Sequence, residues 1–308
     1  LMPLEDLIEE HAPNIQALFE EKPDVARSIT ASDGHIYSLP MVNQASIAVT
    51  APMWINGDWL ETLGVDELPT NTDELYELLV RFRDEDPDQN GEDDTIPLTS
   101  VKLEDGAQNT ISSAFGHLTH GIEVKEDKVQ FASVQDTYKE YLKYMHKLYS
   151  EDLLDSDTFS QELPDMTAKG HENKVGMFVS AGAFLVLNIE NEEDNYKHPV
   201  LPVLTSPVND EKIYPANDGI VRGTFAITRD NPYPEASIRW VDYLYSLEGS
   251  LFVHYGEEGD LWEFADESAG IRKQIPENFP DGMNGEEYRG TITPDVVTPL
   301  PKYVRTEV

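Results

Sequence analysis

The sequence contains no cysteine, which excludes disulfides, thiolate nucleophiles and cysteine-ligated metal sites. It also lacks any apolar run near the length of about 18 residues that a membrane-spanning helix requires. Basic residues are scarce: 22 Lys and Arg stand against 59 Asp and Glu, a formal net charge of -37. A surface of that sign repels phosphate backbones and anionic lipids, which argues strongly against nucleic-acid binding as a main role.

The same acidic excess has a consequence for stability. Like charges on a compact chain repel one another unless counterions screen them, so we expect the fold to gain stability with salt. Two interpretations of the composition stay open: a host from a saline or alkaline habitat, and an acidic protein from an ordinary host.

The sequence does contain enough apolar material for a globular fold. Hydrophobic residues make up 39% of its 308 positions, and a chain of this length exceeds what one core usually serves, so two lobes are expected. Strand-like segments alternate with amphipathic helices, which predicts an α/β fold. The clearest helix follows capping residues at 70–72 and places Leu75, Leu78, Leu79 and Phe82 on one face.

Further elements follow from the same periodicities. We expect helices over 4–11, 14–21, 57–64, 133–149 and 234–245. We expect strands over 35–40, 45–56, 174–179, 200–204 and 219–228. From Glu263 onward Gly, Pro and charged residues become more frequent, and we expect this stretch to wrap the surface.

The sharpest local pattern is an acidic loop over residues 86–94. Calcium prefers oxygen ligands, which a loop supplies from alternate positions with Gly at the sixth. Gly91 stands at that sixth position, whereas Pro97 stands at the twelfth, where an EF-hand has Glu. Five residues are candidate calcium ligands: Asp86, Asp88 and Asn90 through side chains, Glu92 through its backbone carbonyl, and Asp94 directly or through water. The alternative is an ordinary turn in a chain rich in acids.

Patterns for other chemistry are missing. The pair His117 and His120 lacks the Glu of a His-Glu-x-x-His metal motif. No phosphate-cradling Gly-rich loop, dinucleotide fingerprint or Gly-x-Ser-x-Gly elbow occurs. Paired carboxylates carry no information about glycoside hydrolysis here, because close pairs occur throughout so acidic a sequence.

Several aromatic residues lie beside small or polar residues near expected turns, as sugar-stacking platforms often do. Each has a competing interpretation as a core residue, and Trp59 is best explained that way because it lies in a helix beside Leu60 and Leu63. The remaining candidates are Trp54, Phe115, Phe184, Tyr255 and Trp262.

The order of these pieces resembles a known family. The segments are 34–40 (GHIYSLP), 54–64 (WINGDWLETLG), 69–75 (PTNTDEL), 86–94 (DPDQNGEDD), 176–178 (GMF) and 254–259 (HYGEEG). Together they resemble the extracellular solute-binding proteins of family 1, the lipoprotein receptors of carbohydrate ABC importers. The likeness runs over nearly the whole chain and is closest to the branch of Gram-positive bacteria and alginate-oligosaccharide receptors.

This resemblance implies a two-lobed, periplasmic-binding-protein-like α/β fold with a hinge between the lobes. The first lobe would comprise residues 1–44 and 219–253, and the second lobe residues 45–218. Residues 254–308 would pack at the cleft and the second lobe. Family members carry a longer N-terminal portion with a lipidated cysteine and an additional C-terminal helical segment, so we expect the first lobe to be incomplete in this chain.

The resemblance also implies a set of ligand-binding residues. Asn43 and Gln44 match polar sugar ligands of the family, Phe184 matches the aromatic platform of the second lobe, and Tyr255 and Trp262 match a further aromatic cluster. The predicted set is Asn43, Gln44, Trp54, Phe115, Ser180, Phe184, Arg222, Tyr255 and Trp262.

Arg222 has two interpretations, contact with an acidic sugar or an ion pair with a carboxylate. The ion pair is favoured, because one arginine in a strongly negative chain is poor provision for a polyanion. Neutral plant or microbial oligosaccharides are therefore expected in preference to uronates.

The function implied is capture of an oligosaccharide by lobe closure and its delivery, unchanged, to an ABC transporter permease. Calcium would be a structural cofactor, although Thr95 stands where the branch usually has Glu and so weakens the site. We expect a monomer at the extracellular face of the cell membrane, lipid-anchored in the full-length protein. The alternatives are a secreted glycoside hydrolase or lyase with a calcium-stabilised fold, and a structural or adhesive surface protein.

Overall fold

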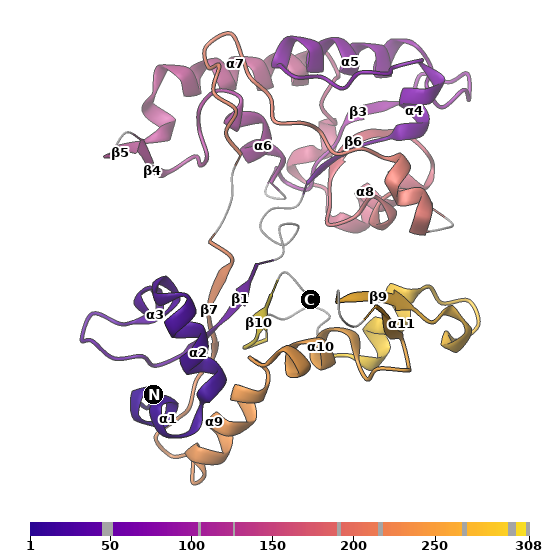
Figure 1. The fold of residues 1–308 in the computed structure, drawn as a ribbon. Helices are drawn as coiled ribbons and strands as arrows, with labels where there is room; N and C mark the ends of the chain where they lie inside the picture. The colour runs from indigo at the N-terminus through magenta and orange to yellow at the C-terminus, as the bar shows by residue number, and fades with distance from the viewer. Residues whose placement is uncertain are drawn as a thin grey trace. The chain divides into compact units, whose positions relative to one another are not determined.

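The computed structural model describes residues 1–44, 52–103, 106–125, 127–189, 192–214, 218–266, 270–294 and 300–305 (Figure 1). By its contacts the chain divides into two compact units: unit 1 is Leu1–Val49 with Asn217–Val308, and unit 2 is Thr50–Ala216. Residues 254–308, which we expected at the cleft and the second lobe, thus fall within unit 1. Among the described residues, no helix is both long enough and apolar enough to cross a membrane.

Unit 1 contains a three-stranded sheet with the order β10-β1-β7. β1 (Leu39–Asn43) pairs antiparallel with β7 (Ile220–Phe225) and parallel with β10 (Tyr303–Val304). The sheet therefore joins segments from the beginning, the middle and the end of the chain. Its helices are α1 (Glu5–His11), α2 (Pro13–Glu21), α3 (Pro23–Ile29), α9 (Pro234–Tyr243) and α10 (Leu247–Tyr255).

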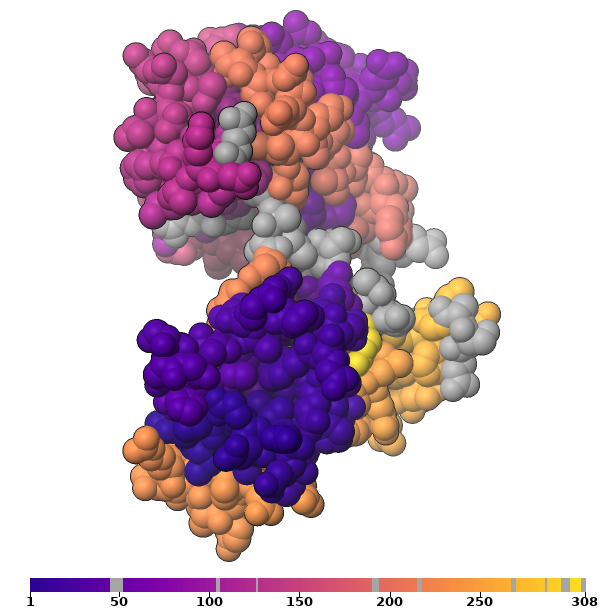
Figure 2. All heavy atoms as spheres, turned by 60° about the vertical axis from the view of Figure 1, so that its left-hand side comes forward, coloured from indigo at the N-terminus to yellow at the C-terminus, as the bar shows by residue number. Residues whose placement is uncertain are grey.

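Proline fixes the start of three of these helices. Pro13, Pro23 and Pro234 each lie in a first turn, where a backbone N–H has no intrahelical partner to lose. Figure 2 shows the N-terminal segment in indigo beside the orange residues of α9, and α1 and α2 both contact α9. The core they share with the sheet includes Leu4, Ile8, Ile15, Leu18, Leu39, Val42, Ile238, Val241, Tyr245 and Tyr303.

A second part of unit 1 follows α10. β8 (Trp262–Asp266) and β9 (Ile271–Gln274) form an antiparallel hairpin, and the 3-10 turn Pro276–Asn278 leads to α11 (Gly285–Ile292). Leu251, Leu261 and Trp262 form the buried centre of this part. The sequence predicted a surface wrap from Glu263 onward; the residues of the hairpin after Trp262 are half-buried or exposed, and the structure adds that they form regular strands.

Unit 2 is built around a sheet with the order β2-β6-β3. The central strand β6 (Val175–Val179) is antiparallel to β2 (Met53–Ile55) and parallel to β3 (Ile96–Leu98). All five residues of β6 are buried, as is typical of a central strand covered on both faces.

Helices and a separate hairpin complete unit 2. The α-helices are α4 (Gly57–Thr62), α5 (Thr72–Asp84), α6 (Ala107–Ser113), α7 (Asp136–Ser150) and α8 (Leu163–His171). The hairpin consists of β4 (Ile122–Lys125) and β5 (Lys128–Phe131). The 3-10 turns are η2 (Ala132–Val134), η3 (Ser156–Phe159), η4 (Ala183–Leu185) and η5 (Glu192–Lys197).

The helix predicted from residue 72 is confirmed as α5. The Asn71 side chain caps it by accepting the N–H groups of Asp73 and Glu74 at 3.0 and 2.9 Å. The predicted apolar face is buried, as the exposures of Leu75, Leu78, Leu79 and Phe82 demonstrate.

Helix α7 starts later than predicted. It begins at Asp136, because residues 132–134 form a 3-10 turn instead. The Ser133 hydroxyl donates to the carbonyl of His120, so it is engaged outside the helix. The shift of the start therefore has a local hydrogen-bonding cause.

Three strand predictions also needed correction. The strand expected over 35–40 forms as β1, later in the chain, at Leu39–Asn43. Of the strand expected over 45–56, only Met53–Ile55 is a strand, and residues 45–51 lie outside the described part. The segment 200–204 contributes an isolated bridge between Val200 and Trp54 in place of a strand.

Candidate ligand-binding site

Tyr255 and Trp262 come together in unit 1 as predicted for an aromatic cluster. Tyr255 ends α10 and Trp262 begins β8, and their ring centroids lie 6.2 Å apart. Phe264 packs edge-on against Trp262, with the centroids at 5.1 Å. The Trp262 indole Nε1 donates to the carbonyl of Gly256 at 3.3 Å. Gly256 has a φ of +79°, a conformation that favours glycine, and so permits the tight return between α10 and the hairpin.

The two predicted rings differ in exposure. Trp262 is 5% exposed, whereas Tyr255 is half-buried. Both line a pocket of about 210 Å³ together with Leu261, Arg272, Lys273 and Gln274. Trp262 therefore supplies a wall, and Tyr255 is the ring with surface left for a ligand.

A larger groove of about 640 Å³ shares Trp262 with this pocket. Leu251, Phe252 and Phe264 supply apolar lining. Carboxylates at Glu248, Glu257 and Glu258 also line it.

In unit 2, two of the predicted ligand-binding residues, Trp54 and Ser180, are linked by a hydrogen bond. The Trp54 indole Nε1 donates to the Ser180 carbonyl at 2.8 Å, and Trp54 pairs with Phe178 across the β2–β6 ladder. Trp54 is 7% exposed and belongs to a buried cluster with Met166. Trp54 was expected to offer an exposed ring face for stacking on a sugar. The structure corrects this, because the ring is packed against core residues.

Phe184 lies in the turn η4 and is half-buried. Its ring lies over Gly182, where a Cβ atom would approach the ring to 2.4 Å. Its backbone N–H donates to Asn195 Oδ1 at 3.2 Å. Gly182 thus makes the space that this ring orientation requires.

Phe115 was predicted as a ligand residue, and the structure contradicts this. The ring is 4% exposed and packs between Tyr141 and Tyr144, with centroid distances of 6.0 and 5.7 Å. A ring enclosed by core neighbours offers no face to a sugar. Phe115 is therefore a core residue.

Asn43 and Gln44 lie at the end of β1, and both are half-buried. The Asn43 N–H donates to the carbonyl of Gly219 at 2.7 Å, and the Gln44 N–H donates to the carbonyl of Val304 at 2.9 Å. Neighbouring strands thus fix the backbone at this point. Gly219 has a φ of +67°, and a Cβ there would lie 2.2 Å from the Asn43 carbonyl oxygen.

Arg222 forms the ion pair that the sequence favoured. Its Nη2 lies 2.5 Å from Asp218 Oδ2, and its Nε donates to the carbonyl of Ser28 at 3.2 Å. Partial burial acts to raise the pKa of Asp218, but the hydrogen bonds from Arg222 and the Ile220 N–H outweigh it and lower that pKa. The predicted interpretation as an ion pair is confirmed.

The acidic loop curls its predicted ligands toward one another. The Asn90 side-chain amide donates to Asp88 Oδ2 at 2.8 Å and to Asp94 Oδ1 at 3.0 Å. The Gly91 N–H donates to the Asp86 carboxylate, with the shorter distance 3.2 Å to Oδ2. Glu92 donates its N–H to Asn90 Oδ1 at 2.6 Å. Gly91, with a φ of +75°, permits this curl.

Electrostatics in the loop favour a positive charge. The pKa of Asp88 is raised first by partial burial, then by a hydrogen bond with Asp86 and by the negative charges of Asp94 and Asp86. Lys174 lies 3.2 Å from Asp94 Oδ2 and 2.8 Å from Glu172 Oε2, so one carboxylate already has a cationic neighbour.

The loop's residues fit calcium in the kind of donors they offer, namely carboxylates, one amide oxygen and one backbone carbonyl. Within the described ranges, no group of three or more His, Asp or Glu side chains is placed to hold a metal ion. The candidate set Asp86, Asp88, Asn90, Glu92 and Asp94 therefore stays a prediction.

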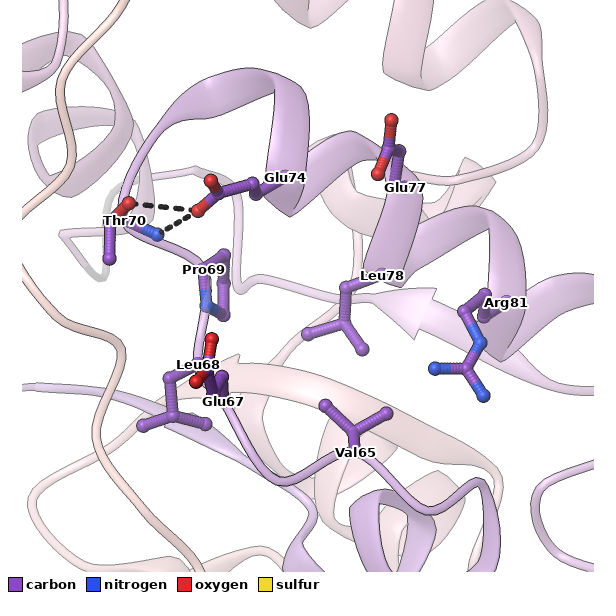
Figure 3. Close-up of a pocket in the computed structure, with 9 residues that line it drawn as sticks. All are labelled: Val65, Glu67, Leu68, Pro69, Thr70, Glu74, Glu77, Leu78 and Arg81. Atoms are coloured by element: carbon purple, nitrogen blue, oxygen red, sulfur yellow. Dashed lines mark hydrogen bonds between the residues drawn. The ribbon is translucent and has the colours of Figure 1, made fainter.

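A further groove, of about 400 Å³, lies in unit 2 between the segment 65–70 and α5 (Figure 3). Glu74 turns back to accept the Thr70 N–H and hydroxyl, both at 2.8 Å. Arg81 is held by the Leu63 carbonyl and by Glu85. Hydrogen bonds within the fold therefore already engage Glu74 and Arg81, the polar groups at the two ends of this groove. None of the predicted ligand-binding residues is among its described lining.

Two other sequence expectations concern packing. Trp59 is fully buried and donates its indole N–H to Asn173 Oδ1 at 3.2 Å, which confirms a structural role. His117 lies within hydrogen-bond distance of Glu123 and Thr137, and His120 contacts the Tyr138 hydroxyl at 2.8 Å.

Sequence reasoning missed Arg272 and Gln274, which line the small pocket in unit 1. The sequence feature that indicates a hairpin here is a pair of short segments in which apolar and polar residues alternate, 262–266 and 271–274. They are separated by a few residues that include Gly270. Frequent Gly, Pro and charged residues around these runs obscured it.

Comparisons with known proteins agree on one family. The sequence profile of the bacterial extracellular solute-binding proteins matches residues 1–250. The fructooligosaccharide ABC transporter substrate-binding protein FusA of Streptococcus pneumoniae serotype 4 is 32% identical over 297 residues, covering 90% of this chain and 53% of FusA. The chain spans about half the length of the curated relatives it matches.

Solved structures agree with the sequence match. FusA of S. pneumoniae in complex with kestose superposes with a TM-score of 0.77 at 31% identity, covering 99% of this chain and 62% of that chain. An EF-hand mutant of FusA in complex with fructo-nystose also has a TM-score of 0.77, at 30% identity and with the same coverage. These matches confirm the predicted family resemblance and the predicted two-lobed α/β fold class.

Proposed function

The chain belongs to the bacterial extracellular solute-binding proteins, and from this premise we propose that it captures an oligosaccharide and passes it unchanged to the permease of an ABC transporter. The observation that carries the proposal is the match to the FusA–kestose structure over 99% of this chain at 31% identity. Kestose and fructo-nystose are the ligands in the two FusA structures, so short fructooligosaccharides are the first ligands to test.

The ligand contacts divide between rings and polar groups. Phe184 and Tyr255 are half-buried, so each retains surface that can stack on a sugar ring. Trp54 and Trp262 support these regions as buried walls. Arg222 is engaged by Asp218 and is left out of the ligand set.

Asn43, Gln44 and Ser180 complete the proposed set as polar partners of sugar hydroxyls. Ligand first meets one lobe, and closure about the hinge then satisfies contacts from both lobes together. The closed form docks on the permease. Transporter substrate-binding proteins are not enzymes, so the proposal requires no acid–base pair.

The acidic loop is proposed to hold calcium through Asp86, Asp88, Asn90, Glu92 and Asp94. The support is the donor chemistry of the loop and the raised pKa of Asp88 among like charges. The FusA EF-hand mutant indicates a corresponding motif in a relative. When bound, the ion would supply the positive charge that these carboxylates lack, and its role would be structural.

The family is extracellular. We place the full-length protein at the outer face of the cell membrane, held by a lipid anchor, and we expect the chain to be monomeric. One relative, LipO of Bacillus subtilis, is named a lipoprotein, which supports the anchor.

Titration calorimetry and thermal melting with kestose, nystose and a panel of neutral and singly acidic oligosaccharides test the function, with chromatography of every mixture for products. We expect saturable binding, a melting temperature that rises with sugar concentration, and unchanged sugar. Release of shorter sugars would mean a glycoside hydrolase or lyase. Absence of binding by every oligosaccharide would favour a structural or adhesive protein and overturn the proposal.

A further inference from the structure

The register of the β8–β9 hairpin gathers a defined set of side chains on one face. Trp262 pairs with Gln274, and Phe264 pairs with Arg272. Paired residues of an antiparallel ladder point to the same side, so aromatic and polar groups alternate along this face. Glu263 and Lys273 form the pair between them and belong to the opposite face.

Arg272 lies on this face over the ring of Tyr255, with its guanidinium carbon 5.0 Å from the ring centroid. Stacking of this kind orients a guanidinium and leaves its N–H groups directed sideways. Among the described residues, no carboxylate forms an ion pair with Arg272.

Its neighbour Lys273 behaves differently. Lys273 Nζ lies 2.7 Å from Glu263 Oε1, so the hairpin neutralises the lysine with its own carboxylate. Within the described part of the chain, no carboxylate pairs with Arg272 in this way. The two adjacent cations therefore have different roles, one within the hairpin and one directed to the pocket.

Gln274 supplies a second polar group at the same place. Its amide lies against the first turn of α11, where a Cβ atom on Gly285 would approach Oε1 to 2.3 Å. Gly285 therefore allows the amide to occupy this position. Asn284 caps α11 and fixes that turn, because its side chain accepts the N–H of Glu287 at 2.9 Å.

The lining of this pocket differs in sign from the two larger grooves. The described lining of the groove of about 640 Å³ includes three glutamates and no lysine or arginine. The groove of about 400 Å³ is lined by three glutamates and one arginine. Among the residues that the structure describes, the pocket of about 210 Å³ is lined by Arg272 and Lys273 and by no carboxylate, and Lys273 is already paired with Glu263.

We propose that this pocket is a subsite for one sugar unit that carries a carboxylate, bound by Arg272 and Gln274 with its ring against Tyr255. A guanidinium offers two parallel N–H groups to a carboxylate, and Gln274 can donate to or accept from a neighbouring hydroxyl. A single cation suits an oligosaccharide with one acidic unit and not a polyanion. This inference rests on the proposed function and replaces the sequence-based expectation of wholly neutral ligands.

The test uses glucuronate as the probe and the indole N–H of Trp262 as the reporter, followed by nitrogen-15 NMR at low salt. Trp262 lines the pocket, whereas Trp240 is 65% exposed on α9 and serves as an internal reference. We expect glucuronate to shift the Trp262 signal saturably and to leave Trp240 in place. Glucose at the same concentration is expected to have little effect.

Variants identify the group responsible. Arg272→Gln should weaken the glucuronate response by at least about tenfold, and Arg272→Lys should weaken it less, because charge remains while the bidentate geometry is lost. Arg239→Gln on α9 removes the same charge from an exposed position and should leave the response within about twofold. Melting curves of each variant check that the fold is intact.

Several outcomes would overturn the subsite. These are no Trp262 response to glucuronate, an equal response to glucose, and full retention of the response in Arg272→Gln. An equal response to inorganic phosphate would reduce the pocket to a general anion site without sugar recognition. The proposed function fails separately, when no oligosaccharide binds by calorimetry, and the glucuronate response of the isolated pocket distinguishes the two failures.

Discussion

Asp242 accepts a hydrogen bond from the backbone N–H of Ile15 at 2.9 Å, although the two residues stand 227 positions apart in the sequence. The same carboxylate accepts the Asn14 side chain at 2.8 Å through its other oxygen. Asp242 lies in α9 and is 4% exposed, so one buried acid satisfies the free N–H groups at the start of α2.

Replacing this acid by alanine should destabilise unit 1. We expect Asp242→Ala to cost about 2 kcal/mol in the free energy of unfolding, because buried N–H groups lose their acceptor. Chemical denaturation monitored by circular dichroism measures it. The control Asp281→Ala removes an exposed acid of the same unit and should cost less than about 0.5 kcal/mol. Equal costs for both variants would contradict the assignment.

A second buried acid gives a pH dependence in unit 2. Burial acts to raise the pKa of Asp155, but hydrogen bonds from Lys169 at 2.8 Å and Thr99 at 2.7 Å outweigh it and hold that pKa below its usual value. A lowered pKa means that Asp155 stabilises the fold above the unfolded value of about 3.9, and that this contribution is lost as the pH falls through the folded pKa.

We therefore expect Asp155→Asn to cost about 2 kcal/mol near neutral pH, and this cost to shrink as the pH falls from about 5 to about 3. Asp157→Asn is the matched control, because Asp157 contacts the same Lys169 at 3.0 Å but its side chain is 62% exposed. Its cost should stay below about 0.5 kcal/mol. A difference between wild type and Asp155→Asn that does not change with pH would contradict this prediction.

Salt should stabilise the whole chain. With a formal net charge of -37, repulsion between surface carboxylates weakens the fold at low ionic strength. We expect the melting temperature to rise by several degrees between about 0.05 M and about 1 M NaCl, as the screening length falls. The rise should diminish at about pH 4, where carboxylates begin to take up protons. Salt-independent melting at neutral pH would argue against repulsion as a limit on stability.

Calcium should stabilise the chain through the loop 86–94. After chelation, added calcium is expected to raise the melting temperature in wild type and in Asp93→Asn, and to have little effect in Asp88→Asn. Asp93→Asn is the matched control, because Asp93 lies in the same loop but outside the proposed ligand set. Both variants remove one negative charge. Without calcium, Asp88→Asn should not destabilise the chain, because Asp88 is already crowded by negative charge. A calcium response that survives in Asp88→Asn would exclude this loop.

Phe184 should contribute to sugar affinity. We expect Phe184→Ala to weaken kestose binding by about tenfold, or ~1.4 kcal/mol, through loss of a stacking face. Leu185→Ala serves as the control, because Leu185 is 47% exposed in the same turn. Its affinity should stay within about twofold of wild type. Calorimetry measures both, and equal affinity of Phe184→Ala and wild type would remove Phe184 from the site.

The sequence predicted local elements well where one face had to be buried. Helix α5 carries caps, an acidic first turn and a regular apolar stripe, so its start and its buried face follow from spacing alone. The strand β6 is likewise a continuous apolar run. The segment 200–204 is also apolar, yet it forms an isolated bridge, because Pro202 has no N–H to donate and pairing depends on neighbours distant in the sequence.

The site was less predictable than the fold. Phe115 and Phe184 both lie beside small residues in the sequence, but Tyr141 and Tyr144 enclose one, while Gly182 leaves the other half-buried. Exposure of a ring is set by side chains from other elements, which spacing does not reveal. For the same reason Arg272 could not be linked to Tyr255 until the hairpin register was known.

The two units also differ in when, during synthesis, all strands of their sheets become available. Unit 2 is one uninterrupted stretch, whereas the sheet of unit 1 needs β7 and β10 from the later part of the chain. During synthesis β1 emerges early and must wait for both partners, while unit 2 already has every strand of its sheet. Of the two three-stranded sheets described, that of unit 1 is therefore the one completed later during synthesis.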